Sequence, residues 1–289
     1  MTEFRKSLTD LVRPHLKDGK FPLALVRGID EILDQAGVPR DGESAPPKPT
    51  KPAEPQPPVA SEALPAGRLD VAGLRRFLGL APAGTIDGEA TKELLARFSN
   101  AGAARLSDAD IDRGAARLGV SAKVVRAVRD VEVKSKPFDS DGRPTILYER
   151  HIFAKHSGNR FNTSHPDISS SKSGGYGKFV EQYPKLARAC ALDPDAAFKA
   201  CSWGAFQVLG ENAEPIGYKS AFEMALKHVE SEGAHLDAFI AFVIGNNLMD
   251  ELKACRAGDP ASCIPFVRRY NGKDFAKNDY HTKLANALK

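Results

Sequence analysis

Apolar side chains recur at helical spacing in most of the chain after residue 68, outside the Ser-, Gly-, Asp- and Pro-rich residues 135–178. Residues 222–247 and 250–258 carry this period over long stretches, and a shorter stretch follows Ser121. An amphipathic helix buries only one face, so a series of such segments has to pack around a shared core. Alternation at Ile146 and Tyr148 indicates the start of one strand. The pattern predicts a mainly α protein with a small β element.

Composition excludes several classes of protein. With 42% hydrophobic and 27% charged residues, the chain has the balance of a water-soluble globular protein. No apolar run approaches 18 residues, so we expect no membrane insertion. The net charge of +4, from 41 basic and 37 acidic residues, attracts nucleic acid only weakly, and no nucleic-acid partner is expected. The N-terminal residues are too charged for a secretory signal peptide.

Proline divides the chain into unequal parts. Residues 41–67 contain eight prolines among short and polar residues, and proline removes a backbone donor and disfavours helix in the residue before it. We therefore expect an extended linker over residues 41–67, with a proline-rich ligand for a partner domain as the alternative. Residues 1–40 carry two short apolar stripes, which predict an N-terminal helical segment of unknown role.

Residues 68–100 form a second unit by pattern. Two apolar helical stripes flank the Asp87-Gly88 turn signal, and we expect a small three-helix module. The segment resembles the small peptidoglycan-binding domain, in a degenerate form, and the residues that match its hallmark are Val71, Leu74, Leu78, Gly79, Asp87, Gly88 and Thr91. Arg76 and Ser99 replace glutamines common in that family, so a packing module without a ligand is the alternative. Residues 101–289 would then form a larger domain.

One acidic residue falls on an apolar helix face. Glu132 lies four residues after Val128 and eight after Val124, within a valine-rich stripe. Burial disfavours the charged form of a carboxyl group, so a glutamic acid in such a place keeps its proton near neutral pH and can donate it. A glycosidic oxygen leaves readily only when it is protonated, so this chemistry suits a glycosidase. The alternative is an ion pair with a buried arginine such as Arg143 or Arg150.

Two further clusters lie in the middle of the sequence. Residues 142–153, GRPTILYERHIF, place Glu149 directly after the predicted strand. Residues 202–210, SWGAFQVLG, contain the chain's only tryptophan. Trp203 and Gln207 are four residues apart, which predicts that they share one helix face, where the ring covers a sugar and the amide bonds its hydroxyls. The alternative places Trp203 in the core.

A last cluster lies near the C-terminus. Tyr270-Asn271-Gly272 indicates a turn after a helix, and Tyr280 begins the approach to the final helix. The two tyrosines are candidates for the wall of a sugar groove, with core packing as the alternative.

In their order along the chain, these clusters resemble the bacteriophage N-acetylmuramidase family. The resemblance covers about residues 115–289 and rests mainly on GRPTILYERHIF and SWGAFQ, with shorter G-G-Y, S-E and Y-N-G elements between and after them. That family belongs to the lysozyme superfamily, which implies a lysozyme-like α+β catalytic domain within residues 101–289. It also implies that Glu132 is the catalytic glutamate. The substrate-binding residues it implies are Ser202, Trp203, Gln207, Tyr270, Asn271 and Tyr280.

The resemblance implies an endolysin that hydrolyses the β-1,4 bond between N-acetylmuramic acid and N-acetylglucosamine in peptidoglycan. Hydrolysis with inversion needs a second carboxylate about 6.5–9.5 Å from the first. The candidates are Asp139, Asp141, Glu149 and Glu232, of which Glu149 is expected to support catalysis. If none is suitably placed, a hydroxyl of the substrate attacks instead, and the enzyme is a lytic transglycosylase that leaves anhydro-muramic ends.

The same resemblance implies the setting of the reaction. Peptidoglycan is the expected partner of a monomer made in the bacterial host cytoplasm and acting on the cell wall in the periplasm, with a separate holin-like protein opening the membrane. No cofactor is expected, and no metal, because the spacing of His151 and His156 does not match a zinc site. Two alternatives remain: a zinc amidase or peptidase, and a non-catalytic cell-wall-binding protein, since Lys134 and Lys136 beside Glu132 would lower its pKa.

Overall fold

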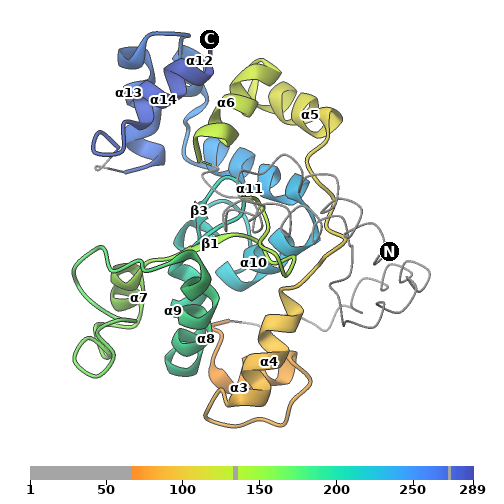
Figure 1. The fold of residues 1–289 in the computed structure, drawn as a ribbon, viewed down its shortest axis with the longest axis vertical. Helices are drawn as coiled ribbons and strands as arrows, with labels where there is room; N and C mark the ends of the chain where they lie inside the picture. The colour runs from red at the N-terminus through yellow and green to blue at the C-terminus, as the bar shows by residue number, and fades with distance from the viewer. Residues whose placement is uncertain (1–66, 133–135, 273–274) are drawn as a thin grey trace, which may run out of the picture. The chain divides into compact units, whose positions relative to one another are not determined.

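The computed structural model describes residues 67–132, 136–272 and 275–289. The predictions for residues 1–40 and for nearly all of the linker over residues 41–67 therefore lie outside the described residues. In the described part the chain is mainly helical with one three-stranded sheet, which confirms the predicted fold class. Figure 1 shows the arrangement.

Most of the helices follow one another closely, but a long connection separates α7 from η3. The α-helices are α3 (Val71–Phe77), α4 (Gly88–Arg97), α5 (Asp108–Leu118), α6 (Ala122–Glu132), α7 (Arg150–His156), α8 (Gln182–Leu192), α9 (Pro194–Lys199), α10 (Ala221–Glu230), α11 (Glu232–Gly245), α12 (Met249–Ala254), α13 (Pro260–Tyr270) and α14 (Tyr280–Ala287), and the 3₁₀ helices are η3 (Phe179–Glu181) and η4 (Gly210–Asn212). Local signals set several ends: Ser107 caps α5 in a capping box, and Gly119 ends it at φ 64°. None of the described helices has the length and apolar character needed to cross a membrane.

The sheet is antiparallel, in the order β1 (Ile146–Tyr148), β2 (Cys201–Trp203) and β3 (Val208–Leu209). Ile146 lies opposite Trp203, and Trp203 lies opposite Val208. The strand predicted at Ile146 is therefore confirmed. The helix face predicted for Trp203 and Gln207 is wrong, because Trp203 ends β2 and Gln207 lies in the turn of the β2–β3 hairpin.

Residues 68–100 pack into the same core as the rest of the described chain. Phe98, which follows α4, stacks on Phe198 and Trp203 with ring centroids 5.8 and 5.6 Å apart. Within residues 68–100, all of which the structure describes, there are two α-helices, α3 and α4, where three were expected. The hydrophobic core continues across residue 100. The domain boundary at that residue, and the likeness of this segment to a peptidoglycan-binding domain, stay predictions.

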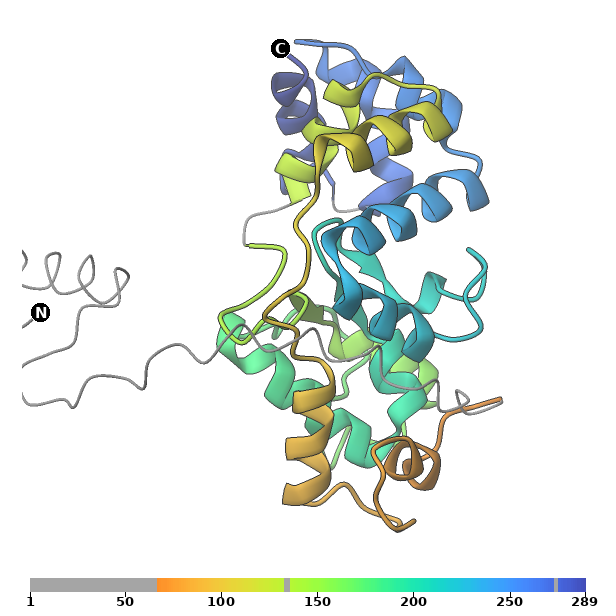
Figure 2. The ribbon, with the colours of Figure 1, turned by 90° about the vertical axis from the view of Figure 1, so that its right-hand side faces the viewer.

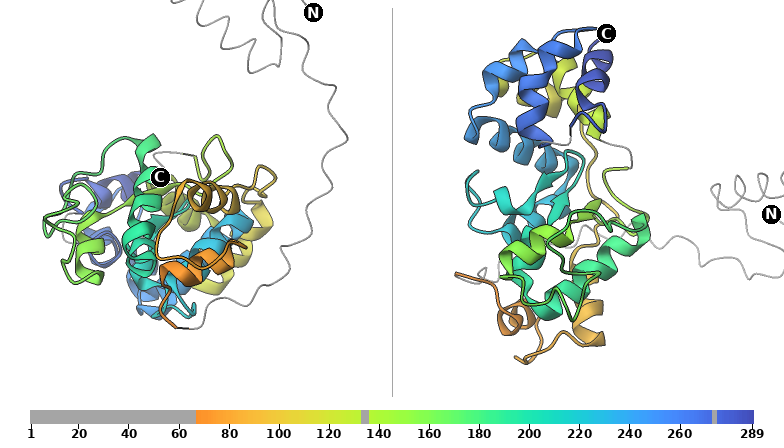
Figure 3. Two further views of the ribbon diagram at one scale, coloured as in Figure 1. Left: turned by 90° about the horizontal axis from the view of Figure 1, so that it is seen from below. Right: turned by 90° about the vertical axis from the view of Figure 1, so that its left-hand side faces the viewer.

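The helices near Glu132 lie together at one end of the described part of the chain. Helices α5 and α6 pack on each other, and α14 packs on both α6 and α13. In Figures 1 and 2 these helices lie at the top with α12, whereas α3 and α4 lie at the bottom beside α8. The right-hand view of Figure 3 shows the same order from a further side, with the sheet between the two groups.

Candidate active site

Glu132 is the last residue of α6 and lies on the helix face formed by the valines. Val125 and Val128 are fully buried, while Val124 and Val131 are half-buried. Glu132 continues this stripe and is itself half-buried. The side-chain amide of Asn271 donates a hydrogen bond to Glu132 Oε1, with 2.6 Å between the nitrogen and the oxygen. The carboxyl group is thus held at the edge of the core, in contact with the residue that follows α13.

Two tyrosines complete this cluster. Tyr270 ends α13, and its hydroxyl donates to the backbone carbonyl of Phe206 in the β2–β3 turn. Burial raises the pKa of Tyr270 well above its ordinary value, and the nearby charge of Glu132 raises it further. Tyr280 begins α14, and burial followed by Glu132 raises its pKa to about 12. Both hydroxyls therefore stay protonated at neutral pH, and the structure brings Glu132, Tyr270, Asn271 and Tyr280 together.

Glu149 directly follows β1 and occupies the N-cap position of α7, where its side chain makes no capping hydrogen bond. Its side chain is 18% exposed, with His151 Nε2 3.7 Å from Oε2. Ser202 Oγ donates to Oε1 over 3.4 Å, so the predicted residue Ser202 contacts Glu149. Burial raises the pKa of Glu149, and this hydrogen bond opposes the rise only in part. The pKa of Glu149 is thus higher than that of an exposed glutamate.

The other three candidate carboxylates are held in ion pairs. Arg143 binds Asp139 at 2.8 Å and also pairs with Asp141. Glu232 is almost completely buried, where Arg129 Nε and the backbone nitrogen of Leu106 donate to it over 2.7 and 3.1 Å. A buried charge whose oxygens are already bonded is poorly suited to activate water. Glu149 differs from these three because Ser202 and His151, and no arginine among the described residues, lie against its carboxyl group.

Trp203 and Gln207 order the hairpin. The indole of Trp203 is fully buried and donates to the carbonyl of Phe198 over 3.3 Å. It has no exposed ring face with which to contact a sugar, which corrects the expected contact. Gln207 has a positive φ of 49°, and its amide donates to the carbonyl of Gly204 over 2.8 Å, closing the turn. Neighbouring Phe206 accepts the hydrogen bond from Tyr270, so the turn supports the Glu132 cluster.

His151 and His156 each lie beside a glutamate. His156 Nε2 lies 2.9 Å from Glu211, whose pKa is lowered by hydrogen bonds from Lys155 and His156 despite partial burial. Within residues 67–132, 136–272 and 275–289, no three His, Cys, Asp or Glu side chains are grouped as metal ligands.

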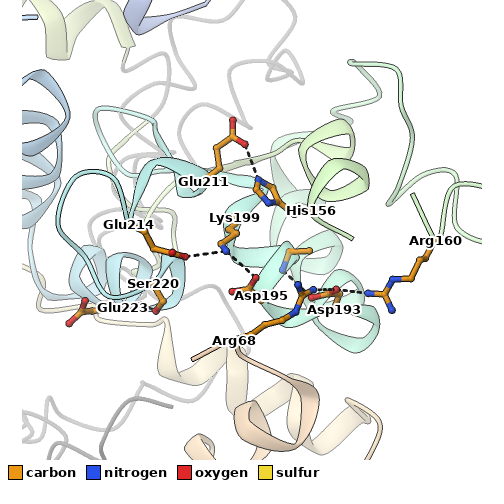
Figure 4. Close-up of polar contacts among 11 residues, drawn as sticks. Arg68, His156, Arg160, Asp193, Asp195, Lys199, Glu211, Glu214, Ser220 and Glu223 are labelled. Carbon is orange, nitrogen blue, oxygen red and sulfur yellow. Dashed lines mark hydrogen bonds and ion pairs between the residues drawn. The ribbon is translucent and has the colours of Figure 1, made fainter. Parts of the chain in front are cut away.

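A cavity of about 650 Å³ lies elsewhere, and none of the residues predicted for the site line it. It is lined by Arg68, Leu69, Asp70, Val71, His156, Ser157, Gly158, Arg160, Leu192, Asp193 and Pro194. Figure 4 shows Arg68 and Arg160 on either side of Asp193, and Lys199 between Asp195 and Glu214. The buried carboxylate of Asp193 is thus already paired, and neither Glu132 nor Glu149 lines this cavity. The candidate active site is elsewhere.

Sequence reasoning gave no role to one residue near the Glu132 cluster. Tyr176 belongs to the connection between α7 and η3, and its hydroxyl is close enough to Tyr280 to contribute to the raised pKa of Tyr280. The signal was present in the sequence as the G-G-Y element at residues 174–176.

The chain is similar to known proteins of one family. The model of the N-acetylmuramidase family matches residues 121–289, which is more than half of the chain. The endolysin of Enterobacteria phage PRD1 is 28% identical over 102 residues. That match covers 35% of this chain and 66% of the relative, just under two thirds of the relative's length.

The fold is also similar to a solved structure, that of the Burkholderia AP3 phage endolysin. The TM-score is 0.57 and the sequence identity 34%, over 75% of this chain and 83% of that chain. The family match begins at Ser121, the residue before α6, and includes Glu132, Glu149 and Tyr280. The chain therefore belongs to the N-acetylmuramidase family and is a glycoside hydrolase, as its motifs predicted.

Proposed function

We propose that this chain acts as a phage-type endolysin. Its substrate is peptidoglycan, in which it hydrolyses the β-1,4 bond between N-acetylmuramic acid and N-acetylglucosamine, with Glu132 as the general acid. The observation that carries the proposal is the placement of Glu132 at the end of α6, bonded by Asn271 and flanked by Tyr270 and Tyr280, inside the segment that matches the N-acetylmuramidase family.

Each member of this cluster has a chemical task in the proposed reaction. Glu132 donates its proton to the glycosidic oxygen, which then leaves as a neutral alcohol. Asn271 holds the carboxyl group in one orientation through its amide. The neutral hydroxyl of Tyr280 is a donor for the oxygens of the bound sugar, while that of Tyr270 ties α13 to the β2–β3 turn.

Glu149 is the proposed second carboxylate. Once ionised, it would accept a proton from a water that attacks the sugar from the face opposite the acid. Ser202 supports this role because its hydroxyl donates to Oε1 and favours the charged form. Gln207 acts indirectly, through the hairpin that carries Ser202.

The experiment is the replacement Glu132→Gln, assayed by reducing sugars released from purified peptidoglycan. We expect the rate to fall by about 10²–10⁴, the usual contribution of a general acid. Glu230→Gln is the matched control, because Glu230 also ends a helix, α10, but is exposed and pairs only with Lys227 on its own helix. Activity of the Glu132→Gln variant within about tenfold of wild type would contradict the assignment.

Mass spectrometry of the released muropeptides identifies the bond and the chemistry. Reducing muramic ends support hydrolysis, anhydro-muramic ends indicate a lytic transglycosylase, and free amino groups that a chelator abolishes indicate a zinc amidase. Binding to insoluble peptidoglycan without any release would indicate a cell-wall-binding protein. The proposal includes action in the periplasm by a monomer, after a holin-like partner has opened the membrane, and requires no cofactor.

A further inference from the structure

The exposed apolar surface is concentrated in one short segment. Of the four large hydrophobic side chains exposed among the described residues, three lie in and beside η3: Tyr176, Phe179 and Val180, at 37%, 48% and 76% exposure. The fourth, Ile244, lies on α11. We call Tyr176 and Phe179 the aromatic shelf. Large aromatic side chains gathered at an exposed place usually mark a binding surface, because each loses favourable burial by staying in water.

The backbone below the aromatic shelf is firmly held. The buried amide of Gln182 donates to the carbonyls of Tyr176 and Lys178 over 2.8 and 2.9 Å, and its oxygen accepts from the backbone of Tyr148 in β1. The Lys185 ammonium donates to the carbonyl of Tyr176 over 2.7 Å. The carbonyl of Tyr176 therefore has two donors, and the segment is anchored to the sheet. Such a preorganised aromatic surface loses little conformational entropy when a ligand binds.

Two glycines precede the aromatic shelf and let the backbone pass close to Arg150. Gly175 has a φ of 71°, and a Cβ atom there would lie 2.8 Å from Cζ of Arg150. The backbone thus crosses directly over the guanidinium group of Arg150, which itself donates to the carbonyl of Pro166. Gly174 also has a positive φ, of 94°. The G-G-Y element is explained by this crossing, since only glycine combines that φ with so close an approach.

The aromatic shelf is tied to the segment that carries Glu149. Gly175 lies over Arg150, the residue after Glu149. Gln182 bonds both to the carbonyl of Tyr176 and to the backbone of the last residue of β1, which precedes Glu149.

Tyr176 also contributes, with Glu132, to the raised pKa of Tyr280. An exposed aromatic surface beside a glycosidase site matches a pyranose ring, which has an apolar face of C–H groups and a polar rim.

We propose that the aromatic shelf, Tyr176 and Phe179, stacks on pyranose rings of the glycan strand that extends from Glu132, and that it sets the affinity of the enzyme for that strand. This inference rests on the proposed function, since it takes the strand from the same peptidoglycan. The ligand class is the N-acetylated glycan backbone itself, without its stem peptides. Because neither side chain contacts the reacting atoms in this scheme, the shelf acts on substrate binding and leaves the proton transfer by Glu132 unchanged.

The test measures kcat and KM on soluble glycan strands from which the stem peptides have been removed. For Tyr176→Ala and for Phe179→Ala we expect KM to rise by about tenfold, which is the loss of one stacking contact, with kcat within about threefold of wild type. Tyr176→Phe keeps the ring and should restore the wild-type KM. Ile244→Ala is the matched control, because it removes an exposed apolar side chain on another element. Thermal unfolding confirms that the variants fold.

A second measurement separates this inference from the proposed function. Binding of the same strands is measured directly, with the Glu132→Gln replacement in every variant, so that affinity is obtained without turnover. A loss of affinity on removing either ring supports the shelf, whatever the role of Glu132 proves to be. Unchanged affinity in both alanine variants overturns it, even if Glu132→Gln is inactive. It is equally overturned if the rings affect only binding to phosphatidylglycerol vesicles, which would make the segment a membrane contact.

Discussion

Two carboxyl groups of the site sit in different surroundings. Glu132 is met by the amide of Asn271 and lies beside two tyrosine hydroxyls, whereas Glu149 is enclosed with Ser202 and His151 close to it. Burial is the largest influence on Glu149 and raises its pKa. The proposed role of Glu132 as the acid therefore rests on its position among Asn271, Tyr270 and Tyr280, and not on the raised pKa of Glu149.

Asn271 is predicted to be a positioning residue. In Asn271→Ala the hydrogen bond to Glu132 Oε1 is lost, and we expect kcat to fall by about tenfold or more, the equivalent of one hydrogen bond to a charged group. KM should change less, because the amide bonds the enzyme's own carboxyl group. The measurement is steady-state kinetics on peptidoglycan fragments, with Asn286→Ala, an exposed site on α14, as control. A raised KM with unchanged kcat would instead make Asn271 a substrate-binding residue.

At the scale of elements, the β2–β3 hairpin joins the two halves of the site. Its first strand carries Ser202 toward Glu149, and its turn accepts the hydrogen bond of Tyr270 through Phe206. The hairpin can turn so tightly because Gly204 adopts a φ of 68° where it passes the rings of His228 and His235. Residues from α10, α11 and the sheet therefore meet at a position that accepts no side chain.

Gly204→Ala is expected to destabilise the protein strongly. A Cβ atom at this position would lie 2.7 Å from His228 Cδ2 and from His235 Cγ, in addition to the strain of a positive φ. We expect the free energy of unfolding to fall by about 2–4 kcal/mol. Gly79→Ala is the matched control: its φ of 75° is similar, but nothing lies within 4 Å of the added atom, so the loss should be about 1–2 kcal/mol. Urea denaturation measures both, and equal losses would show that the histidine rings yield.

At the scale of the whole molecule, one core joins the described elements from Leu69 to Leu288. Two stacked histidines lie inside it, with ring centroids 4.8 Å apart. His235 accepts a hydrogen bond from the backbone of Ala205 at Nδ1 and donates from Nε2 to the carbonyl of His228. His228 donates from Nδ1 to the carbonyl of Met224, while its buried Nε2 has no hydrogen-bond partner among the residues that the structure describes. The interactions of His235 require the neutral ring, and a proton on His228 Nε2 would be buried without an acceptor.

This pair of histidines predicts that the protein becomes less stable as the pH is lowered. Burial lowers the pKa of His228 to about 3 and that of His235 to about 4. Both pKa values lie below the ordinary 6.5 of an unfolded histidine, so the unfolded chain takes up protons first. The stabilisation is complete above pH 6.5 and is lost as the pH falls toward 4. Between pH 7 and pH 5 each histidine should cost about 2 kcal/mol of unfolding free energy, measurable by urea denaturation. A free energy that is constant over this range would contradict the prediction.

Much of the site could be predicted from local sequence because its parts lie at helix ends. The valine stripe placed Glu132 at the edge of the core, and the turn at Asn271 marked the end of α13. The helix face expected for Trp203 and Gln207 was wrong because a four-residue spacing also fits a hairpin whose first strand is buried on both sides. Sequence spacing cannot separate the two when the segment is short and apolar.

Sequence by itself determined the helical character of this protein and the chemistry its side chains offer, since amphipathic period, caps and motif order are written in neighbouring residues. Only the tertiary structure decided which carboxyl groups are held in ion pairs, that burial raises the pKa of Glu149, that Trp203 is core, and that Tyr176 is close enough to Tyr280 to affect its pKa. Those outcomes depend on contacts between residues distant in the chain. Burial and pKa are properties of such contacts and of the solvent they exclude, so they are set only once the chain has folded.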